Sequence, residues 1–336
     1  MNEYIKIFID KQYPSFIDKY LKTPTLNRIK YVTQFCGCDY TNIYNPLFLF
    51  TRFDHSLVVA HIVWHFTHDK KATIVALLHD VGTPCFAHTI DCVFGDYLEQ
   101  ESSEKQIADI VKKDYKLLQL LEDDGLSISD LSDMSKYPIL ENKAPNLCAD
   151  RLDGVLHTCY IWLHSHSLEE IREVYEDLCI LTNEYGHQEI GFNNKKIAIK
   201  FAKMVSVYSK ELQSNRDKYV SKYISEIIKL SFAKGIVSLT DLYTKKEKEI
   251  INVIKNSFPS WTLFEKASKV LGSTTKPTQF YISYEIKKRI TVPLVNMKNK
   301  AERIIDVSKT ANKIYFMIDN FKDKKYGYVK EIKNLE

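Results

Sequence analysis

Histidine and aspartate residues stand at the ends of three apolar segments, where their side chains could act together. His55 opens one such segment, the pair His79-Asp80 closes a second, and Asp150 stands near the start of a third. Two imidazoles and two carboxylates suit a divalent ion, because nitrogen and hard oxygen ligands together accept manganese, iron, cobalt, nickel or zinc, with magnesium as a further candidate. Four protein ligands also leave coordination positions for water and a phosphoryl oxygen.

The pair His79-Asp80 is the most informative of these. It ends the apolar run of residues 76–78, so two polar side chains come to lie beside the core. Burial of that kind is unfavourable unless the polar groups have a partner, and a bound cation is the simplest one. We therefore predict a metal site formed by His55, His79, Asp80 and Asp150.

Other histidines in this region need no metal. His68-Asp69 repeats the His-Asp pair, but it lies in the polar stretch Thr-His-Asp-Lys-Lys between two helical segments, and we expect it to be solvated. His61, His65 and His68 follow one another at helical spacing on one face. No carboxylate of another segment is evidently placed to join them, so we expect a surface or subunit-contact stripe.

Three further residues flank the predicted site. Asp153 and His157 follow Asp150 by about one and two helical turns. Asp153 either bonds to a ligand imidazole or pairs with a nearby arginine, and both alternatives stay open. His88 comes after a Gly-Thr-Pro turn that can fold it back over the ion, where an imidazole could contact phosphate or donate a proton to a leaving oxygen.

The spacing of apolar residues predicts the elements that position these groups. We expect helices within residues 1–20, 54–66, 71–79, 102–121, 145–162, 168–181, 195–232 and 238–256. Strand-like patterns follow at residues 278–295, 313–318 and 326–332. The apolar spacing therefore predicts a helical body at residues 1–185. We expect a helical extension at residues 186–336, with a small α+β C-terminal part.

The composition is that of a globular protein. The 336 residues are 45% hydrophobic and 27% charged, which is ordinary for a chain with a full core. The net charge of +4 requires no nucleic-acid partner. The longest apolar runs are too short to span a bilayer and the N-terminus lacks a signal-peptide core, so we expect a cytoplasmic protein. The seven scattered cysteines then indicate reduced thiols.

The motifs taken together resemble the HD-domain metal-dependent phosphohydrolase superfamily, and most closely its deoxynucleotide triphosphohydrolase-like branch. The likeness rests on four blocks: Thr23-Pro24 with Arg28-Ile29-Lys30 and Gln34; Arg52-Phe53-Asp54-His55-Ser56-Leu57; His79-Asp80-Val81-Gly82 with Phe86 and His88; and Ala149-Asp150-Arg151-Leu152-Asp153. It is dense over residues 23–88 and again at 147–157.

The resemblance implies an all-α HD-domain catalytic core that hydrolyses phosphate esters or anhydrides with a metal ion. It implies that Gln34 lies near a sugar hydroxyl and that Arg52 and Arg151 contact phosphates. It also implies that His88 faces the scissile phosphate and that Asp80 takes part in catalysis as a metal ligand.

One catalytic residue of the family has no direct counterpart in this chain. The family carries a further histidine past the position of His88, whereas residues 89–156 contain none. Glu104 lies in that neighbourhood and could supply an acid or reach the ion.

These residues together predict attack of a metal-activated water on a phosphorus atom of a nucleotide, with a (deoxy)nucleoside triphosphate favoured. Two alternatives use the same ligands. One is a phosphodiesterase or nucleoside monophosphatase of the same superfamily, and the other is a catalytically weak nucleotide-binding sensor.

Two basic clusters raise a last alternative, a nucleic-acid-binding module. They are Lys287-Lys288-Arg289 and Lys322-Asp323-Lys324-Lys325. Glu285 and Asp323 dilute their charge, so we expect solvated faces, and only a steep loss of oligonucleotide affinity with salt would revive this alternative. The expected partners are therefore a phosphorylated small molecule, most simply a nucleotide, and further copies of this chain in a homo-oligomer.

Overall fold

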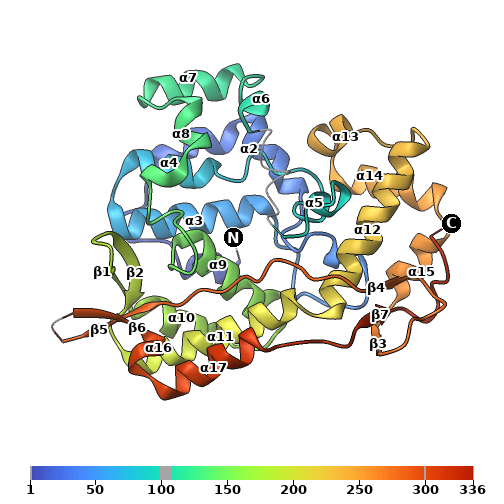
Figure 1. The fold of residues 1–336 in the computed structure, drawn as a ribbon. Helices are drawn as coiled ribbons and strands as arrows, with labels where there is room; N and C mark the ends of the chain where they lie inside the picture. Colours follow the sequence, from blue (N-terminus) through green and yellow to red (C-terminus); the bar gives the residue numbers. More distant parts are fainter. Residues whose placement is uncertain (1, 99–106, 299, 336) are drawn as a thin grey trace.

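A computed structural model describes residues 2–98, 107–298 and 300–335 of the chain. Helices dominate it, at 54% of the residues, and short strands form two small sheets (Figure 1). The predicted mostly helical fold with a small sheet part is thereby confirmed. No helix in the described ranges is both long and apolar enough to span a bilayer.

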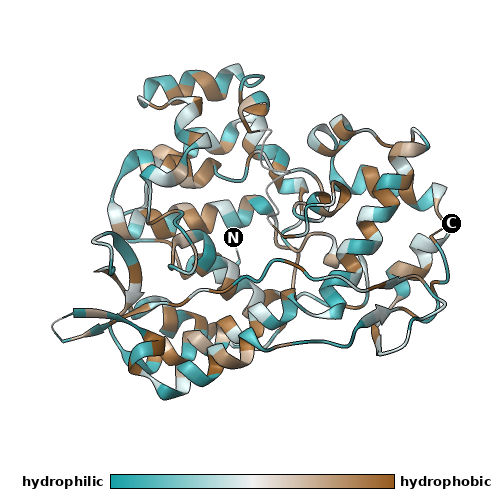
Figure 2. Ribbon diagram, viewed as in Figure 1, coloured by the Kyte–Doolittle hydropathy of each residue, from teal (hydrophilic) through white to brown (hydrophobic). Residues whose placement is uncertain are grey.

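The helices fall into two runs along the chain. The first run is α1 (Glu3–Lys6), α2 (Pro24–Arg28), α3 (Arg52–Thr67), α4 (Lys70–Leu78), α5 (Thr89–Val93), α6 (Ile107–Val111), α7 (Tyr115–Asp123), α8 (Ile128–Ser132), α9 (Ala149–His157) and α10 (Leu168–Glu176). The second is α11 (Lys195–Leu212), α12 (Asn215–Ala233), α13 (Leu239–Thr244), α14 (Glu247–Ser257), α15 (Ser260–Lys266), α16 (Ile304–Val307) and α17 (Lys309–Asp319). Hydrophobic and hydrophilic residues alternate around the axes of the longer helices, as expected when one face packs on a core (Figure 2).

Helix α3 packs against both α4 and α9. Its start is fixed by a capping box, in which the Thr51 hydroxyl accepts from the Asp54 amide and the Asp54 carboxylate accepts from the Thr51 amide. Helix α4 begins at Asp69, whose side chain accepts from the amides of Lys71 and Ala72. Asp69 is exposed, as predicted for the His68-Asp69 linker, and its role is that of a helix cap.

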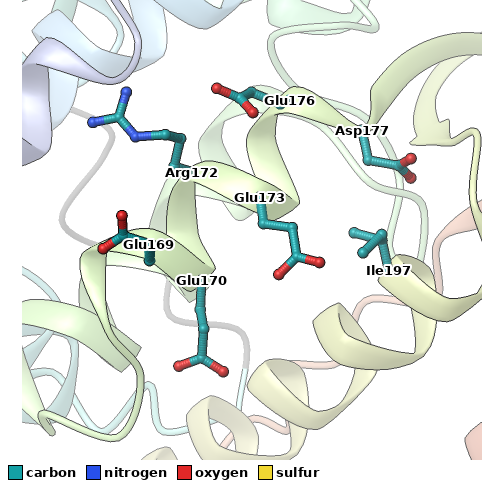
Figure 3. Close-up of a pocket in the computed structure, with 7 residues that line it drawn as sticks. All are labelled: Glu169, Glu170, Arg172, Glu173, Glu176, Asp177 and Ile197. Carbon is teal, nitrogen blue, oxygen red and sulfur yellow. The ribbon is translucent and has the colours of Figure 1, made fainter.

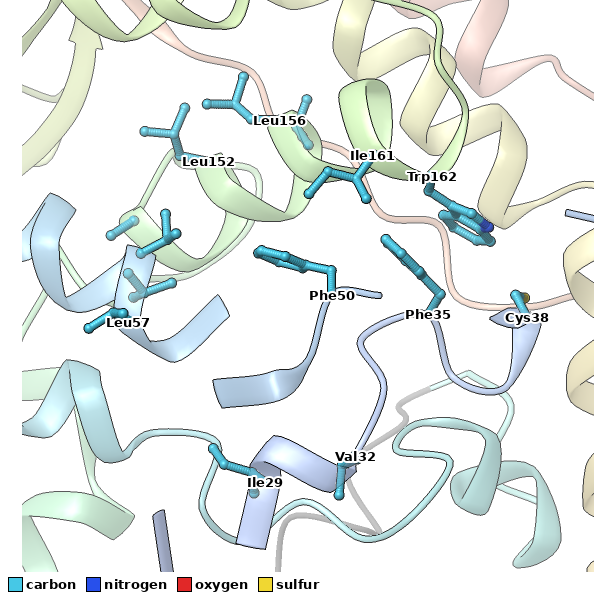
Figure 4. Close-up of a cluster of buried hydrophobic side chains, with 14 of the residues drawn as sticks. Ile29, Val32, Phe35, Cys38, Phe50, Leu57, Leu152, Leu156, Ile161 and Trp162 are labelled. Atoms are coloured by element: carbon cyan, nitrogen blue, oxygen red, sulfur yellow. The ribbon is translucent and has the colours of Figure 1, made fainter. Parts of the chain in front are cut away.

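A hydrophobic cluster joins α3, α9 and the loop that precedes α3 (Figure 4). Phe35 stacks on Trp162, with ring centroids 5.2 Å apart and an interplanar angle of 19°. Phe50, Leu152 and Leu156 are fully buried in the same cluster. This packing fixes α9, and with it the aspartates near its start, against the first turn of α3.

The strands form one sheet of four strands and one of three. They are β1 (Leu178–Thr182), β2 (Gln188–Phe192), β3 (Leu271–Ser273), β4 (Tyr281–Ile282), β5 (Leu294–Met297), β6 (Lys300–Arg303) and β7 (Tyr326–Tyr328), in the orders β1-β2-β5-β6 and β3-β7-β4. Strand β2 pairs in parallel with β5, where Gly191 faces Leu294. A Cβ at Gly191 would lie 3.0 Å from the carbonyl oxygen of Leu294, so the close approach of the two strands favours glycine.

The β1–β2 hairpin spans the predicted boundary at residue 185, which falls in its turn. The four-stranded sheet therefore takes strands from both of the predicted domains. The division into residues 1–185 and 186–336 stays a prediction.

Several predicted elements were wrong. The pattern at residues 313–318 is rich in β-formers, but these residues belong to α17. Its buried positions are Ala311, Ile314, Tyr315 and Ile318, which follow the helical period, while Phe316 is 65% exposed. Residues 283–293 lie outside any strand, although the whole of 278–295 was predicted as strand. Only the flanking strands belong to a sheet, β4 to the three-stranded one and β5 to the four-stranded one, because the chain between them crosses from the first sheet to the second (Figure 1).

Three predicted helices are shorter than expected or are divided. The segment 168–181 is helical only as far as Glu176 and then enters β1. Within the described part of 102–121, α6 ends at Val111 and Asp114 caps a separate helix, α7, by accepting from the Leu117 amide. In place of one α-helix over residues 1–20, the chain has α1 followed by a 3₁₀ helix at Ser15–Lys22.

The predicted stripe of surface histidines was wrong at His61. His65 and His68 are exposed, but His61 is fully buried on α3. Both of its ring nitrogens lack a hydrogen-bond partner among the described residues. The reason is that the first part of α3, which includes His61, is enclosed on more sides than a surface helix, whereas its end near His65 is exposed.

Burial lowers the pKa of His61 to about 4, with Asp10 opposing only weakly. Since this is below the unfolded value of about 6.5, the native protein binds fewer protons than the unfolded chain between these two pH values. The free energy of unfolding should therefore fall as pH drops through this window, by on the order of 3 kcal/mol from His61 alone. Urea unfolding from pH 7.5 to 4 should show a flatter profile for His61→Leu than for the wild type. The exposed His187→Leu is the matched control, and parallel profiles for His61→Leu and the wild type would contradict the assignment.

Candidate metal centre

Two imidazoles meet where the N-terminal turn of α3 faces the C-terminal end of α4. Nδ1 of His79 donates to the carbonyl oxygen of Ala76 at 2.7 Å, and Nδ1 of His55 donates to a carboxylate oxygen of Asp153 at 2.6 Å. Each ring is thereby oriented with Nε2 toward the other residues of the cluster. The ring centroids of His55 and His79 lie 5.2 Å apart.

The two predicted carboxylates lie beside these nitrogens. Asp150 places Oδ1 at 2.9 Å from Nε2 of His55 and at 3.6 Å from Nε2 of His79. Asp80 places Oδ2 at 4.0 Å and 3.8 Å from the same two atoms. The structure thus brings together all four residues that the sequence singled out as metal ligands.

The residues of this cluster fit a divalent cation. His55, His79 and Asp80 each offer a ligand atom within 4.8 Å of the others. Nε2 of His79 is buried and has no hydrogen-bond partner among the described residues. Buried polar atoms normally have a partner, and a metal ion would supply one here. Nitrogen and carboxylate donors suit a first-row divalent ion.

The cluster also stabilises positive charge. Burial by itself would lower the pKa of His55, but hydrogen bonds to Asp150 and Asp153 outweigh it and raise the pKa to about 10. Burial likewise opposes ionisation of Asp80, yet the charge of Arg52 and then of the two imidazoles holds its pKa below the usual value. A negative potential of this kind would favour a bound cation as well as a proton.

Asp153 and His157 support His55 from behind. The Oδ2 atom of Asp153 accepts from Nδ1 of His55 and lies 3.1 Å from Nδ1 of His157, and its Oδ1 atom accepts from the Tyr4 hydroxyl. The carboxylate of Asp153 is fully buried. Of the two alternatives left open by the sequence, a bond to the imidazole and a pair with an arginine, the structure has the first.

The turn after α4 holds Asp80 in place. Arg28 donates from Nη2 to the carbonyl oxygens of Val81 and Thr83, at 2.8 Å and 2.6 Å. The Thr83 hydroxyl and Nη1 of Arg52 both donate to the Asp80 carboxylate, each at 3.0 Å. The side chain of Arg52 is therefore buried against Asp80, at the edge of the cluster.

The cluster lies in a cavity of about 1030 Å³. Gln34, Arg52, His88 and Arg151 also line it, so the predicted substrate-binding residues and His88 share one space with the metal cluster. The Gln34 side-chain oxygen is buried there with no hydrogen-bond partner in the described parts of the chain. The predicted catalytic residue Glu104 lies outside the residues that the structure describes.

Arg151 is bound on several sides to the loop before α9. Its Nη1 donates to the Asn142 side chain at 2.6 Å and to the Asn146 carbonyl at 2.8 Å. Its Nη2 pairs with Glu141 at 2.5 Å. These contacts fix the guanidinium at the cavity wall and neutralise part of its charge.

His88 reaches the cavity from a strained turn. Phe86 and Ala87 adopt left-handed φ values of 64° and 44°, and the Phe86 amide donates to the buried carboxylate of Glu247 at 2.7 Å. The Thr33 hydroxyl donates to the same carboxylate at 2.9 Å. Strain of this kind persists only where the surroundings hold the backbone, and Glu247 supplies that hold. Sequence reasoning missed Glu247.

The cavity also receives residues that sequence reasoning had placed on a solvated face. Lys287 and Arg289 line it, although the basic cluster 287–289 was predicted to be solvated. Lys288 lines the cavity as well, so no alternation of side chains along this segment could have given the signal.

A second hollow, of about 510 Å³, lies along α10 (Figure 3). It is lined by Glu169, Glu170, Arg172, Glu173, Glu176, Asp177 and Ile197. Glu170 completes the capping box of α10 with Ser167, and Glu173 pairs with Lys200. These are structural roles, and we assign this acidic surface no chemistry.

Known proteins resemble this chain mainly in fold. No family model matches it. It is 24% identical over 242 residues to the uncharacterized protein YdhJ of Bacillus subtilis, a match that covers 72% of this chain and 71% of that protein. A phosphohydrolase of Bacteroides thetaiotaomicron superposes with a TM-score of 0.61 at 13% identity over 99% of both chains. A hypothetical protein of Aquifex aeolicus does so with a TM-score of 0.55 at 15% identity, over 94% of this chain and 92% of that one. These two likenesses establish a shared fold.

Proposed function

We propose that this protein is a metal-dependent phosphohydrolase of the HD type that acts on a nucleotide, with a (deoxy)nucleoside triphosphate as the favoured substrate. His55, His79, Asp80 and Asp150 would hold one divalent ion. The proposal rests on the orientation of the His55 and His79 rings. The Nδ1 atom of each ring donates to an acceptor, so that each Nε2 atom points toward the carboxylates at the cavity wall. The shared fold of a phosphohydrolase supports the same reaction class.

The ion would supply an activated water and withdraw charge from a phosphoryl oxygen. Arg52 would orient the Asp80 carboxylate and place a positive charge beside the reacting phosphate. Asp153 would hold the His55 ring, so that its Nε2 is kept for the ion.

His88 would act on the leaving group. Nδ1 of His88 donates a hydrogen bond to a carboxylate oxygen of Asp91 at 3.1 Å. The other ring nitrogen, Nε2, is thereby left to contact the substrate. Burial lowers the pKa of His88, and the charge of Arg289 lowers it further. Once protonated, such a ring is a strong proton donor toward a leaving oxygen. Gln34 would contact the sugar and Arg151 a phosphate, and Glu104 would serve as a second acid.

Phosphate-release profiling tests this function. The protein, loaded in turn with manganese, iron, cobalt, nickel, zinc or magnesium, is incubated with nucleoside tri-, di- and monophosphates and cyclic nucleotides. We expect turnover of a nucleoside triphosphate, and chromatography of the products tells tripolyphosphate from pyrophosphate and phosphate. Turnover confined to monophosphates or to cyclic nucleotides would replace the triphosphate assignment by the monophosphatase or phosphodiesterase alternative. Saturable nucleotide binding without any product would establish a sensor in place of an enzyme.

A further inference from the structure

Asp217 stands in the first turn of α12, at a position that completes a capping box elsewhere in this chain. In α3, α8, α10 and α13, the acidic residue three positions after the cap accepts a hydrogen bond from the amide of the cap residue. Ser214 and Asp217 repeat this spacing, but the Ser214 amide donates to the Glu211 carbonyl at 2.9 Å instead. Within the described chain, the carboxyl group of Asp217 therefore takes no part in capping α12.

This carboxyl group lies at the cavity instead. Asp217 is only 8% exposed, and it lines the cavity together with Ser221, which follows it by one turn on the same face of α12. Among the described residues, the one hydrogen bond to the carboxyl comes from the Cys38 thiol, at 3.8 Å. A thiol is a weak donor, and a buried carboxyl with so weak a partner is unfavourable unless a ligand supplies a better one.

The electrostatics of Asp217 agree with this lack of a strong donor. Burial, and then the neighbouring charge of Glu211, raise the pKa of the Asp217 carboxyl to about 8, and Arg289, Cys38 and Lys218 oppose this rise only in part. Well-placed hydrogen-bond donors would have held the pKa of a buried carboxyl low. The group is therefore buried without the contacts that usually compensate for burial.

A turn at residues 36–38 connects Asp217 with the metal cluster. Nη2 of Arg52, at the edge of the cluster, donates to Sγ of Cys36 at 3.6 Å. At the other end of the same turn, Cys38 contacts Asp217. A ligand that reaches both the cluster and the Asp217 carboxyl must therefore extend along this turn, as a molecule with a phosphate end and an uncharged end can do.

Aromatic rings border the cavity near this turn. Phe35 and Trp162, whose rings stack, both line it, and Figure 4 shows them beside Cys38. Tyr44 packs against Trp162 with ring centroids 4.9 Å apart, and its hydroxyl donates to Glu211 at 2.6 Å, just before α12. Aromatic walls suit a planar ring, because bases pack well on such side chains.

We infer that Asp217 accepts a hydrogen bond from the exocyclic amino group of the substrate's nucleobase. The inference rests on the proposed function, and it names the part of the nucleotide by which the site selects its substrate. A carboxyl oxygen accepts from an N–H group whether the carboxyl is ionised or protonated. Adenine and cytosine present such an amino group, whereas thymine presents a carbonyl oxygen at the corresponding position. A phosphate fits less well, because a buried acid offers it no positive charge.

Nucleosides test this contact, because they contain no phosphate and so are not hydrolysed by the metal-loaded protein. One pair of ligands is deoxyadenosine and purine deoxyriboside, which lacks only the amino group. The other is deoxycytidine and the pyrimidinone deoxyriboside that lacks the same group. A buried polar group left without its partner typically costs about five- to a hundredfold in affinity, so isothermal titration should show that preference for the amino-bearing member of each pair.

Asp217→Leu removes the acceptor and keeps much of the side-chain volume. The two members of each pair should then bind within about twofold of each other, because neither leaves a protein acceptor unpaired. Asp217→Asn keeps an oxygen that can accept from the amino group, and it should retain the preference in the wild-type direction. Asp241→Leu is the matched control, since Asp241 holds the same position in α13 and completes its capping box. It should show the wild-type preference.

Three results would overturn the inference. The first is equal wild-type affinity for the two members of both pairs. The second is an equal loss for both members in Asp217→Leu, which would assign the carboxyl to the sugar. The third is turnover of deoxyadenosine and deoxycytidine triphosphates with the same kcat/KM in Asp217→Leu as in the wild type, which would leave the proposed enzyme standing. A preference that Asp217→Leu abolishes, in a protein that hydrolyses no nucleotide, would instead refute the enzyme and leave the base contact standing.

Discussion

His79→Ala is expected to abolish stable metal binding. The purified wild type should carry about one divalent ion per chain, as a site of four nitrogen and oxygen ligands does. Replacement of even a supporting residue of a metal site typically weakens metal affinity by ten- to a hundredfold, so loss of a direct ligand should exceed about a hundredfold. Elemental analysis after gel filtration should find less than a tenth of the wild-type metal in His79→Ala and in Asp80→Ala, and phosphate release should fall in proportion.

Two further variants sharpen this measurement. Asp153→Asn removes the negative charge that holds Nδ1 of His55 and should weaken metal binding by about ten- to a hundredfold without eliminating it. Asp69→Asn keeps a side chain that can cap α4 and should retain full metal, because Asp69 lies in the exposed linker of the second His-Asp pair. Full metal content in both His79→Ala and Asp80→Ala would refute the metal centre.

Arg303→Met is expected to lower the free energy of unfolding by about 3–5 kcal/mol. The Arg303 guanidinium, 10% exposed, contacts both oxygens of the fully buried Glu189 carboxylate, at 2.6 Å and 2.9 Å. It also donates to the Val292 carbonyl at 2.9 Å and to the Asn146 side chain at 2.8 Å. Methionine would fill much of the same volume but would leave the Glu189 charge buried without its partner.

Urea unfolding at pH 7 measures this effect. Lys300→Met, in the same strand and 70% exposed, is the control and should change the free energy of unfolding by less than about 0.5 kcal/mol. The double variant Arg303→Met/Glu189→Met removes both charges and should recover much of the loss, since two apolar side chains can replace a buried ion pair. A single variant as stable as Lys300→Met would show that the ion pair contributes nothing.

Local sequence determined the elements that build the cluster. The apolar runs predicted α3 and α4, and the structure has them within two residues of the expected starts and ends. The polar pair His79-Asp80 at the end of such a run has few physical explanations, because buried charge requires a partner. That reasoning, and the motif that includes His55 and Asp150, singled out four residues that the structure brings together. The identity of the ion and the role of Glu104 stay predictions.

Only tertiary structure decided what faces these residues. Residues 283–293 carry a pattern typical of a strand, yet whether such a segment pairs or crosses a cavity depends on where its neighbours lie. His61 was expected at the surface because periodicity describes one helix at a time, while its burial results from what packs around α3. The strained turn before His88 is held by Glu247, which lies 161 positions from Phe86 in the sequence. Contacts between residues so far apart in sequence leave no local pattern. The sequence therefore singled out the side chains that we predict to bind the metal, and the packing of distant segments specified the walls of the site.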